Sequence, residues 1–414
     1  MAGPRSWRRV GMKSAMDRLE RIVLMTPVNR ELLARSLISE GQMNLPAAAY
    51  VDASVLRWEM EHFFDGSWVC VGRSEDLRNA GDRRAVRLGH ERALLVRDES
   101  GKLRAFYNVC RHRGHELMAV GETASGRFVR CPYHAWAYGL DGELRGAPGF
   151  GKSDGFDKAD YPLVPVRIAE WQGWVFANSS GEAVPFEEHV GNLGDMIGNH
   201  GAGELVTAAR QDYEVEANWK ILVENYHECY HCPSIHPELC KVSPPKSGED
   251  HESRGAWVGG SMELEDHAET MSLTGESFAP RLPHLAAGQE REVYYYQIFP
   301  NLLISPHPDY VMTHRLTPVA PDRTHVECEW LFSRETVETE GFDPSYATEF
   351  WHITNGQDWR ACESVQRGVS SRGYRQGPLS PEESTVGKFV AMVARGYLEG
   401  RVAQAPGRTS ETVQ

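Results

Sequence analysis

The sequence predicts an α+β fold made of two units, a β-rich N-terminal unit and a larger C-terminal unit in which helices flank an antiparallel sheet. Short runs of β-branched and aromatic residues, broken by Gly, Asp and Asn, fill residues 67–180 and predict the first unit. After residue 181, segments with helical spacing mix with strand-like segments, which predicts the second unit. With 414 residues, the chain is long enough for two or three domains.

The first 66 residues are expected to contribute an extension and a helix. Residues 1–45 are expected to be an N-terminal extension and not an export signal. An export signal needs a longer apolar core, and acidic residues interrupt the short apolar patch here. Residues 46–66 contain the helix, whose segment 51–64 is amphipathic and is expected to pack on the C-terminal unit. The apolar face of this segment consists of Leu56, Met60 and Phe63 or Phe64.

Within residues 67–180, short segments with the composition of strands are separated by turn-forming residues such as Asp141 and Gly142. The predicted strands lie in residues 67–73, 92–98, 103–109, 126–131 and 173–179.

The C-terminal unit, residues 181–400, is expected to combine helices with an antiparallel sheet. Helices are predicted at 216–230 and 345–368, and strands at 292–304, 311–319 and 324–333. Residues 248–277, rich in Gly, Ser, Asp and Glu, are expected to form a long loop that could serve as a lid. Residues 401–414 are expected to be a flexible tail.

Charge and composition limit the partners of the chain. Lys and Arg number 44 and Asp and Glu number 58, which gives a net charge of −14 and favours small-molecule partners over nucleic acid. The chain has no run of 18 apolar residues, so we expect no membrane span and a cytoplasmic protein. Its eight cysteines are expected to be reduced thiols or metal ligands, because no export signal precedes them.

Two short motifs in the β-rich unit have the pattern of a metal centre. Cys110 and His112 are followed by Cys131 and His134, in segments with turn-forming residues. A Rieske [2Fe–2S] cluster takes two Cys on one iron and two His on the other, which this set supplies. A zinc site is the alternative, but zinc usually takes a first pair with a longer spacing.

A second constellation lies in the C-terminal unit. His231 and His236 can provide two of the three ligands of a mononuclear Fe(II) site, which needs two His and one carboxylate. The candidates for the carboxylate are Asp358 and Glu363, in the predicted helix 345–368. The nearby cysteines could instead form a zinc site with His231, or pack as small apolar residues. These cysteines are Cys229, Cys232 and Cys240.

With these motifs, the sequence resembles the catalytic α subunits of Rieske non-haem iron oxygenases, the aromatic-ring-hydroxylating dioxygenase superfamily, from about residue 50 to 400. The resemblance implies a Rieske [2Fe–2S] domain at 67–180 and a helix-grip catalytic domain at 181–400. It implies that the cluster is held by Cys110, His112, Cys131 and His134, and the mononuclear iron by His231, His236 and Asp358.

The resemblance also implies a path for electrons. Family members are typically head-to-tail homotrimers, in which a carboxylate links the cluster of one subunit to the iron of its neighbour. Glu228 stands at the position of this carboxylate, and His134 matches its partner on the cluster side. Many ring-hydroxylating members have Asp at the bridge, and the Glu here is more similar to the branch that acts on glycine betaine, carnitine and other quaternary ammonium compounds.

Aromatic faces and carboxylates recognise a trimethylammonium group, and residues 257–310 offer several of each. The predicted substrate pocket consists of Trp257, Tyr294, Tyr296, Phe299, His307, Asp309 and Tyr310. Strand alternation would send Tyr294 and Tyr296 to one face of the sheet and Tyr295 to the other.

The expected function is therefore that of an oxygenase component that uses O2 to N-demethylate a quaternary ammonium compound such as glycine betaine, with release of formaldehyde. Electrons would come from NAD(P)H through a separate flavin and iron–sulfur reductase, because the chain has no Gly-rich dinucleotide fingerprint. One alternative is hydroxylation of an aromatic or heterocyclic ring by the same machinery, as a monooxygenase or a dioxygenase. Another is a non-catalytic Rieske electron carrier, and a structural zinc protein is a third.

Overall fold

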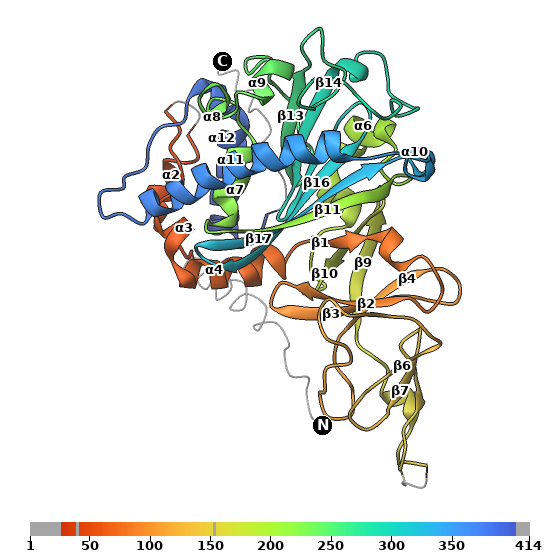
Figure 1. Cartoon of the computed structure of the whole chain (residues 1–414). Helices are drawn as coiled ribbons and strands as arrows, with labels where there is room; N and C mark the ends of the chain where they lie inside the picture. Colours follow the sequence, from red (N-terminus) through yellow and green to blue (C-terminus); the bar gives the residue numbers. More distant parts are fainter. Residues whose placement is uncertain (1–25, 39–40, 152–154, 403–414) are drawn as a thin grey trace, which may run out of the picture.

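The computed structural model describes residues 26–38, 41–151 and 155–402, and the expected extension and tail lie partly outside them. Figure 1 shows a larger unit, in which helices lie against a sheet, and a smaller β unit that projects from it. The predicted α+β fold is confirmed. No helix in the described part of the chain has both the length and the apolarity to cross a membrane.

The smaller unit contains two sheets. Its seven-stranded sheet has the order β1-β10-β9-β4-β3-β2-β5, and its three-stranded sheet has the order β6-β7-β8. The first sheet consists of β1 (Val69–Arg73), β2 (Arg83–Leu88), β3 (Glu91–Arg97), β4 (Leu103–Tyr107), β5 (Thr123–Ala124), β9 (Pro165–Trp171) and β10 (Trp174–Asn178). The second consists of β6 (Phe128–Arg130), β7 (Ala137–Gly139) and β8 (Leu144–Gly146). Each of the five predicted segments contains a strand, namely β1, β3, β4, β6 and β10.

The larger unit is built on an antiparallel seven-stranded sheet with the order β11-β17-β16-β15-β14-β13-β12. Its strands are β11 (Val206–Val215), β12 (Glu249–Asp250), β13 (Trp257–Glu263), β14 (Glu292–Ile298), β15 (Leu302–Pro306), β16 (Val311–Ala320) and β17 (Arg323–Phe332). Helix α11 crosses the sheet in Figure 1, with α7 and α12 behind it.

The helices range from single turns to one long helix. The α-helices are α2 (Arg30–Ala34), α3 (Ala48–Val51), α4 (Ala53–Glu59), α5 (Phe186–Val190), α6 (Leu193–Ile197), α7 (Trp219–Tyr226), α8 (Cys232–Ile235), α9 (Leu239–Val242), α10 (Arg334–Glu338), α11 (Ser345–Val369) and α12 (Ser384–Glu399). A π-helical turn, η1, covers Met60–Phe64. Short 3-10 turns are η2 (Ser74–Leu77), η3 (Lys158–Asp160), η4 (Gly198–His200), η5 (Gln289–Arg291) and η6 (Pro381–Glu383).

The single helix predicted at 51–64 is wrong, because the chain forms α3, α4 and η1 there. Asp52 leaves the helical conformation and caps α4, with its side chain accepting a hydrogen bond of 2.7 Å from the Ser54 backbone N–H. The buried face of the segment contains Val55 and Trp58 of α4, followed by Phe63 in the π turn.

The long loop predicted at 248–277 is also wrong, because β12 and β13 lie within it. The glycines that suggested a loop are needed for close strand approach. A Cβ on Gly259 would lie 2.3 Å from the Tyr295 carbonyl oxygen, and one on Gly260 would lie 2.0 Å from that of Glu249. Glycine here permits the pairing of strands instead of breaking it.

Helices α7 and α11 position the chemistry-bearing residues. Asn218 caps the start of α7, with its side chain accepting a hydrogen bond of 3.1 Å from the Lys220 N–H, and the helix ends at Tyr226. It is therefore shorter than the predicted 216–230. Helix α11 ends at Val369, one residue beyond the predicted range of 345–368.

A buried ion pair joins the N-terminal helices to the C-terminal unit. The Glu59 carboxylate accepts a hydrogen bond of 2.7 Å from Lys220 Nζ and one of 2.9 Å from Trp219 Nε1. Tyr397 of α12 donates a further hydrogen bond to Glu59. Glu59 thus forms hydrogen bonds with three residues of the C-terminal unit, and the buried charges of Glu59 and Lys220 are paired with each other.

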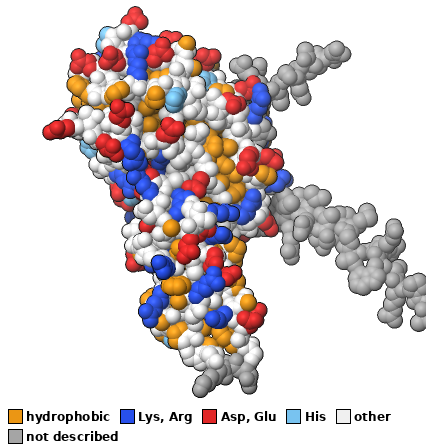
Figure 2. Space-filling view, turned by 90° about the vertical axis from the view of Figure 1, so that its right-hand side faces the viewer, with side chains coloured by type: hydrophobic (Ala, Val, Ile, Leu, Met, Phe, Trp, Pro, Cys, Tyr) orange, Lys and Arg blue, Asp and Glu red, His pale blue; other side chains and the backbone are white. Residues whose placement is uncertain are grey.

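An ion pair also joins the two units. Asp76 of the β unit pairs with Arg84 of the same unit at 3.0 Å and with Arg210 of β11, in the larger unit, at 2.7 Å. Figure 2 shows basic and acidic side chains side by side at the waist of the molecule, where the two units meet.

Candidate functional site: two metal centres

The first centre is formed by two tight turns near the end of the β unit. In one, the Gly114 N–H donates to the Cys110 carbonyl at 3.0 Å, and Gly114 has a φ of +71°, which favours glycine. In the other, the Cys131 N–H donates to the Trp136 carbonyl at 2.8 Å, next to β7. Both cysteines are buried, so each turn directs a thiol inwards.

The two histidines of these turns face each other. The ring centroids of His112 and His134 are 4.6 Å apart, and His112 stacks on Trp136 with centroids 4.9 Å apart. His112 Nδ1 is buried without a hydrogen-bond partner, as a nitrogen that binds a metal would be. Two thiols and two imidazoles from two adjoining turns fit a Rieske cluster.

The second centre brings together His231, His236 and Asp358. The two Nε2 atoms are 3.1 Å apart, and Asp358 Oδ1 lies 3.4 Å from His231 Nε2 and 2.9 Å from His236 Nε2. Two imidazoles and a carboxylate that converge on one point form the donor set of a mononuclear Fe(II) site. The residues present therefore fit this metal.

These three residues come from two parts of the chain. His231 directly precedes α8 and His236 directly follows it, so this single turn of helix holds the two rings on one side. Helix α7 ends at Tyr226, and the separate short helix α8 lies between the two histidines, with Pro233 in its first turn. Asp358 lies in the middle of α11.

Of the two candidate carboxylates, the structure brings only Asp358 to the histidines. The Glu363 carboxylate instead accepts a hydrogen bond of 3.3 Å from the Glu216 N–H. Burial acts to raise the pKa of Asp358, but the hydrogen bonds to His231 and His236 hold that pKa below its usual value.

Each histidine is oriented by a second polar group. His231 Nδ1 is hydrogen-bonded to the Glu228 carboxylate, which also accepts a hydrogen bond of 3.0 Å from the His231 backbone N–H. His236 Nδ1 donates to Gln357 Oε1 at 2.6 Å, and the Gln357 amide donates to Glu238 at 3.0 Å. These contacts fix the rings so that both Nε2 atoms point at the centre.

Cys229 and Cys232 form a disulfide across the turn that carries His231. The expectation that all eight cysteines are thiols or metal ligands is therefore wrong for this pair, whose Cα atoms are only 4.8 Å apart. The other six cysteines, Cys240 included, are free.

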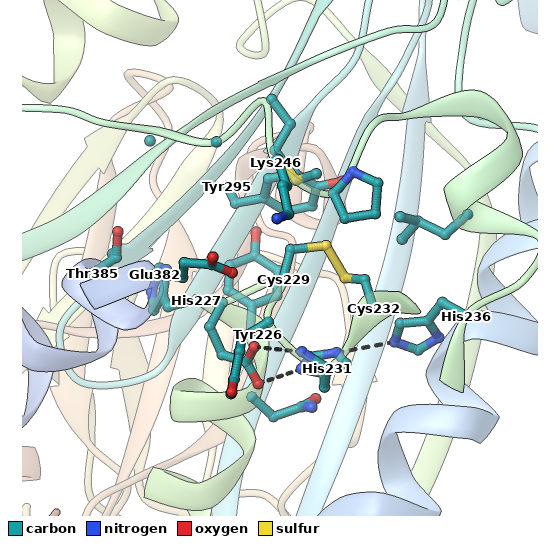
Figure 3. Close-up of a pocket in the computed structure, with 18 of the residues that line it drawn as sticks. Tyr226, His227, Cys229, His231, Cys232, His236, Lys246, Tyr295, Glu382 and Thr385 are labelled. Carbon is teal, nitrogen blue, oxygen red and sulfur yellow. Dashed lines mark hydrogen bonds and ion pairs between the residues drawn. A yellow bond between two sulfur atoms is a disulfide. The ribbon is translucent and has the colours of Figure 1, made fainter. Parts of the chain in front are cut away.

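A cavity of about 430 Å³ opens beside the second centre. Figure 3 shows part of its lining, which includes His231, His236, the disulfide, Tyr295 and Lys246. Its aromatic lining consists of Tyr226, Tyr230, Tyr295 and Trp351, and its acidic lining, apart from the metal-site residues, of Glu249, Asp250 and Glu382. The cavity is therefore both aromatic and acidic.

The predicted pocket residues do not line this cavity, so that prediction is corrected. Strand alternation does separate Tyr295 from its neighbours, but Tyr295 is the residue that faces the cavity. Tyr294 and Tyr296 stack on the opposite face of β14, in a core that also contains Trp257. Phe299 packs against Phe63 in the other core.

The remaining predicted residues have structural partners. Asp309 accepts hydrogen bonds from the hydroxyls of Thr270 at 2.5 Å, Ser277 at 2.6 Å and Tyr346 at 2.6 Å, which ties 270–277 to the sheet. His307 stacks on Tyr310, and burial lowers the pKa of His307 to about 3, so it is neutral.

Sequence reasoning missed Tyr295, Lys246 and Gln357 as site residues. The alternation of β14 separates Tyr295 from its neighbours but does not say which face is the cavity. Gln357 precedes Asp358 in the chain, and that adjacency is its only local signal. Burial and the Asp358 charge raise the pKa of Tyr295, so its hydroxyl, buried without a partner, remains a donor.

Comparison with known proteins defines the class. A family model of the Rieske [2Fe-2S] domain matches residues 67–165, and one described as the ring hydroxylating alpha subunit (catalytic domain) matches residues 203–399. The chain is thus an oxidoreductase of the Rieske oxygenase type, a class that carries a [2Fe–2S] cluster and a non-haem iron. The match to a catalytic domain excludes a bare electron carrier and a structural zinc protein.

Relatives that match most of the chain identify its family more closely. The carnitine monooxygenase oxygenase subunit of Escherichia coli (strain K12) is 32% identical over 348 residues, which cover 83% of this chain and 89% of the relative. The glycine betaine monooxygenase oxygenase subunit of Chromohalobacter salexigens is 28% identical over 405 residues, covering 89% and 88%. The chain therefore belongs to the Rieske non-haem iron oxygenase α subunits, among relatives that act on quaternary ammonium compounds.

A solved structure agrees with these relatives. It is that of a quaternary ammonium Rieske monooxygenase, described as giving insight into carnitine oxidation by gut microbiota and inter-subunit electron transfer. It matches with a TM-score of 0.76 and 26% identity, and the match covers 90% of this chain and 99% of that one.

Proposed function

We propose that this chain is the oxygenase component of a system that oxidises an N-methyl group of a quaternary ammonium compound and releases formaldehyde. The observation that carries the proposal is the cavity itself, which joins the His231, His236 and Asp358 centre to a lining of aromatic rings and carboxylates. An arene pocket would be mostly apolar. The names of the relatives support the same class of substrate.

The metal site has one clear chemical task. Iron held by His231, His236 and Asp358 would supply the activation of dioxygen, because this ligand set leaves positions open for it. The protein contributes position and shape. Gln357 and Glu228 hold the two imidazoles in place, and the cavity walls limit the access of water to the reacting group.

The aromatic wall suits a trimethylammonium group. Tyr295 lies edge-to-face with Tyr226 at 5.6 Å between centroids and near Trp351 at 6.5 Å. Such faces attract a quaternary cation, and a desolvated cation–π contact contributes about 2 kcal/mol. At the rim, Asp250 is paired with Lys388 at 2.9 Å, while Glu249 and Glu382 are exposed. The negative rim would draw a cation towards the cavity.

Lys246 is suited to bind the end of the substrate opposite the ammonium group. Among the described residues that line the cavity, it is the only Lys or Arg, and it is labelled with other lining residues in Figure 3. Glycine betaine and carnitine carry a carboxylate that choline lacks. We therefore assign the carboxylate of a zwitterionic substrate to Lys246, and the ammonium group to the aromatic wall.

Electrons would reach the iron from another subunit. In Figure 1, the turns beside β6 and β7 lie at one end of the molecule and α8 lies near the other. Transfer within one chain would have to cross that length, whereas a head-to-tail homotrimer would bring His134 of one subunit to Glu228 of the next. A separate NAD(P)H-dependent flavin and iron–sulfur reductase would supply the electrons. The inter-subunit transfer described for the carnitine-oxidising relative supports this arrangement.

The test is oxygen uptake with formaldehyde release, measured on iron-replete protein with a surrogate reductase. The substrates are glycine betaine, carnitine, choline, proline betaine and two arenes. We expect formaldehyde in proportion to oxygen with one of the carboxylate-bearing ammonium compounds. A hydroxylated arene without formaldehyde would contradict the proposal and establish ring hydroxylation instead.

Lys246→Met tests the substrate orientation. An exposed ion pair contributes up to about 1 kcal/mol, so we expect KM to rise about fivefold for the carboxylate-bearing substrate and to stay unchanged for choline. Lys241→Met is the matched control, because Lys241 is exposed on α9 and does not line the cavity. An equal change in KM for both kinds of substrate would remove Lys246 from carboxylate binding.

A further inference from the structure

The Cys229–Cys232 disulfide has no part in the proposed reaction, yet it spans the turn that carries a metal-site residue. Its sulfur atoms bridge residues on either side of His231, and both cysteines line the cavity. In the view of Figure 3, the disulfide is drawn between Lys246 above and the ring of His231 below. A redox-active group therefore lies where oxygen chemistry would take place.

Cys232 also lies within the metal site itself. Its Sγ atom and one ring nitrogen each of His231 and His236 are all within 4.8 Å of one another. Two imidazoles with a thiolate are a donor set that zinc favours, whereas two imidazoles with the Asp358 carboxylate suit Fe(II). The sulfur in a disulfide is not a thiolate, so the redox state of Cys232 decides which set is available.

We propose that the Cys229–Cys232 pair is a redox switch of metal preference. As a disulfide, the pair leaves the centre to His231, His236 and Asp358 with its open positions. Reduction frees the Cys232 sulfur as an added thiolate donor, which favours zinc over iron. This inference rests on the metal site assigned under the proposed function.

Hydrogen peroxide, the two-electron reduction product of dioxygen, is the oxidant that we assign to the switch. Cys229 is the more exposed of the two, since Cys232 is only 3% exposed. The Cys229 thiolate attacks peroxide, the O–O bond breaks, and sulfenic acid and one water form. The Cys232 sulfur then displaces the second water and forms the S–S bond. Two thiols and one peroxide thus give one disulfide and two waters, and a small dithiol reverses the change by exchange.

The free cysteines of the same unit show that burial alone does not explain why Cys229 and Cys232 form a disulfide. Cys328 and Cys362 are 0% and 1% exposed, and burial raises the pKa of both thiols. They are packed as small apolar residues and are chemically protected. Cys229 and Cys232 instead open on the cavity and lie close enough to bond.

Zinc binding to full-length protein with its cluster intact tests the switch. Each form is prepared with peroxide or with a dithiol, and its thiols are counted by alkylation. X-ray absorption at the zinc edge reports sulfur ligands without interference from the iron cluster. Competition with a chromophoric chelator gives the zinc affinity. A sulfur ligand appears at about 2.3 Å, and nitrogen ligands appear at about 2.0–2.1 Å.

Two serine variants separate the roles of the cysteines. Cys229→Ser cannot close the disulfide and keeps the Cys232 thiol, so we expect a zinc–sulfur contact under both conditions. Cys232→Ser should show none under either condition. Wild-type protein should gain the contact, and bind zinc at least tenfold more tightly, only after reduction.

The outcomes distinguish this inference from the proposed function. If His231→Ala abolishes zinc binding but reduced wild-type protein shows no sulfur ligand, the switch is overturned and the metal site stands. If zinc affinity is the same in both redox states, the switch is likewise overturned. If His231→Ala leaves zinc binding unchanged, the metal site and the proposed function both fail.

Discussion

We call the part of the molecule that would hold the [2Fe–2S] cluster the cluster end, and the part that would hold the mononuclear iron the iron end. The ligand residues of the two ends are separated by very different distances along the chain. Cys110, His112, Cys131 and His134 lie within 25 residues, on turns whose shape is set by their own backbone hydrogen bonds. The iron end needs α8 and the middle of α11, which only the folded sheet and helices bring together. The first site depends on local structure, and the second depends on tertiary packing.

Replacing one ligand at each end should give the largest effect and the sharpest contrast. Cys131→Ser should lose the visible spectrum of the cluster, whereas His236→Ala should keep that spectrum and lose only the mononuclear iron. Both should lose turnover altogether. Iron analysis with cluster absorbance checks this, and loss of cluster in His236→Ala would contradict the separation of the two ends.

Glu228→Gln asks whether the two ends communicate through this carboxylate. Gln can still accept a hydrogen bond from His231, so both metal centres should remain filled, while coupled turnover falls by about 100-fold or more. Reduction of the cluster in single-turnover experiments should proceed as in wild type, without product. Loss of iron in this variant would instead make Glu228 a structural group of the centre.

Glu59→Gln tests the dependence of the iron end on tertiary packing. It leaves the Lys220 ammonium buried without its partner, and breaking such a pair costs about 3–5 kcal/mol. Burial lowers the pKa of Lys220, although the Glu59 charge opposes this, so Lys220 would release its proton more readily in the variant. Denaturant unfolding measures the loss, and the exposed Glu61→Gln on the same segment should change stability by no more than about 0.5 kcal/mol.

The smallest expected effect is a change in how the stability of the protein depends on pH. Burial raises the pKa of Glu224, next to Tyr50, to about 8 from a usual value of 4.5. A carboxyl whose pKa is raised by folding stabilises the protein below its usual pKa, and this contribution is lost as the pH rises through about 8. Glu224→Gln should therefore have a flatter stability profile between about pH 5 and pH 8. Unfolding at several pH values checks this, and parallel profiles would contradict it.

The same contrast explains what could be predicted from the sequence. The four cluster residues are close in sequence, and their spacing alone indicates the centre. At the iron end, spacing found His231 and His236 but left Asp358 and Glu363 open, because the choice depends on how α11 lies against α8. Only packing, or a resemblance to known proteins, separates the two.

The pocket prediction failed for a related reason. Both faces of β14 are covered, one by the core that contains Tyr296 and the other by the cavity and Trp351. A strand with aromatic residues on both sides gives no sign of which side is hollow. The fold class and about half of the strands were predictable because they depend on local periodicity, although the predicted strand at 292–304 is two strands, β14 and β15. The strands hidden at 249–263 were not, because their glycines are explained only by the neighbouring strands.

The central claim is that the aromatic and acidic cavity serves the oxidation of an N-methyl group. The most direct measurement uses glycine betaine and carnitine with ¹³C in their N-methyl groups, iron-replete protein, a surrogate reductase and NMR of the products. The account predicts ¹³C-labelled formaldehyde and the demethylated amine in equal amounts from one of them. Oxygen consumption with both substrates intact, together with a hydroxylated arene when an arene is supplied, would contradict it.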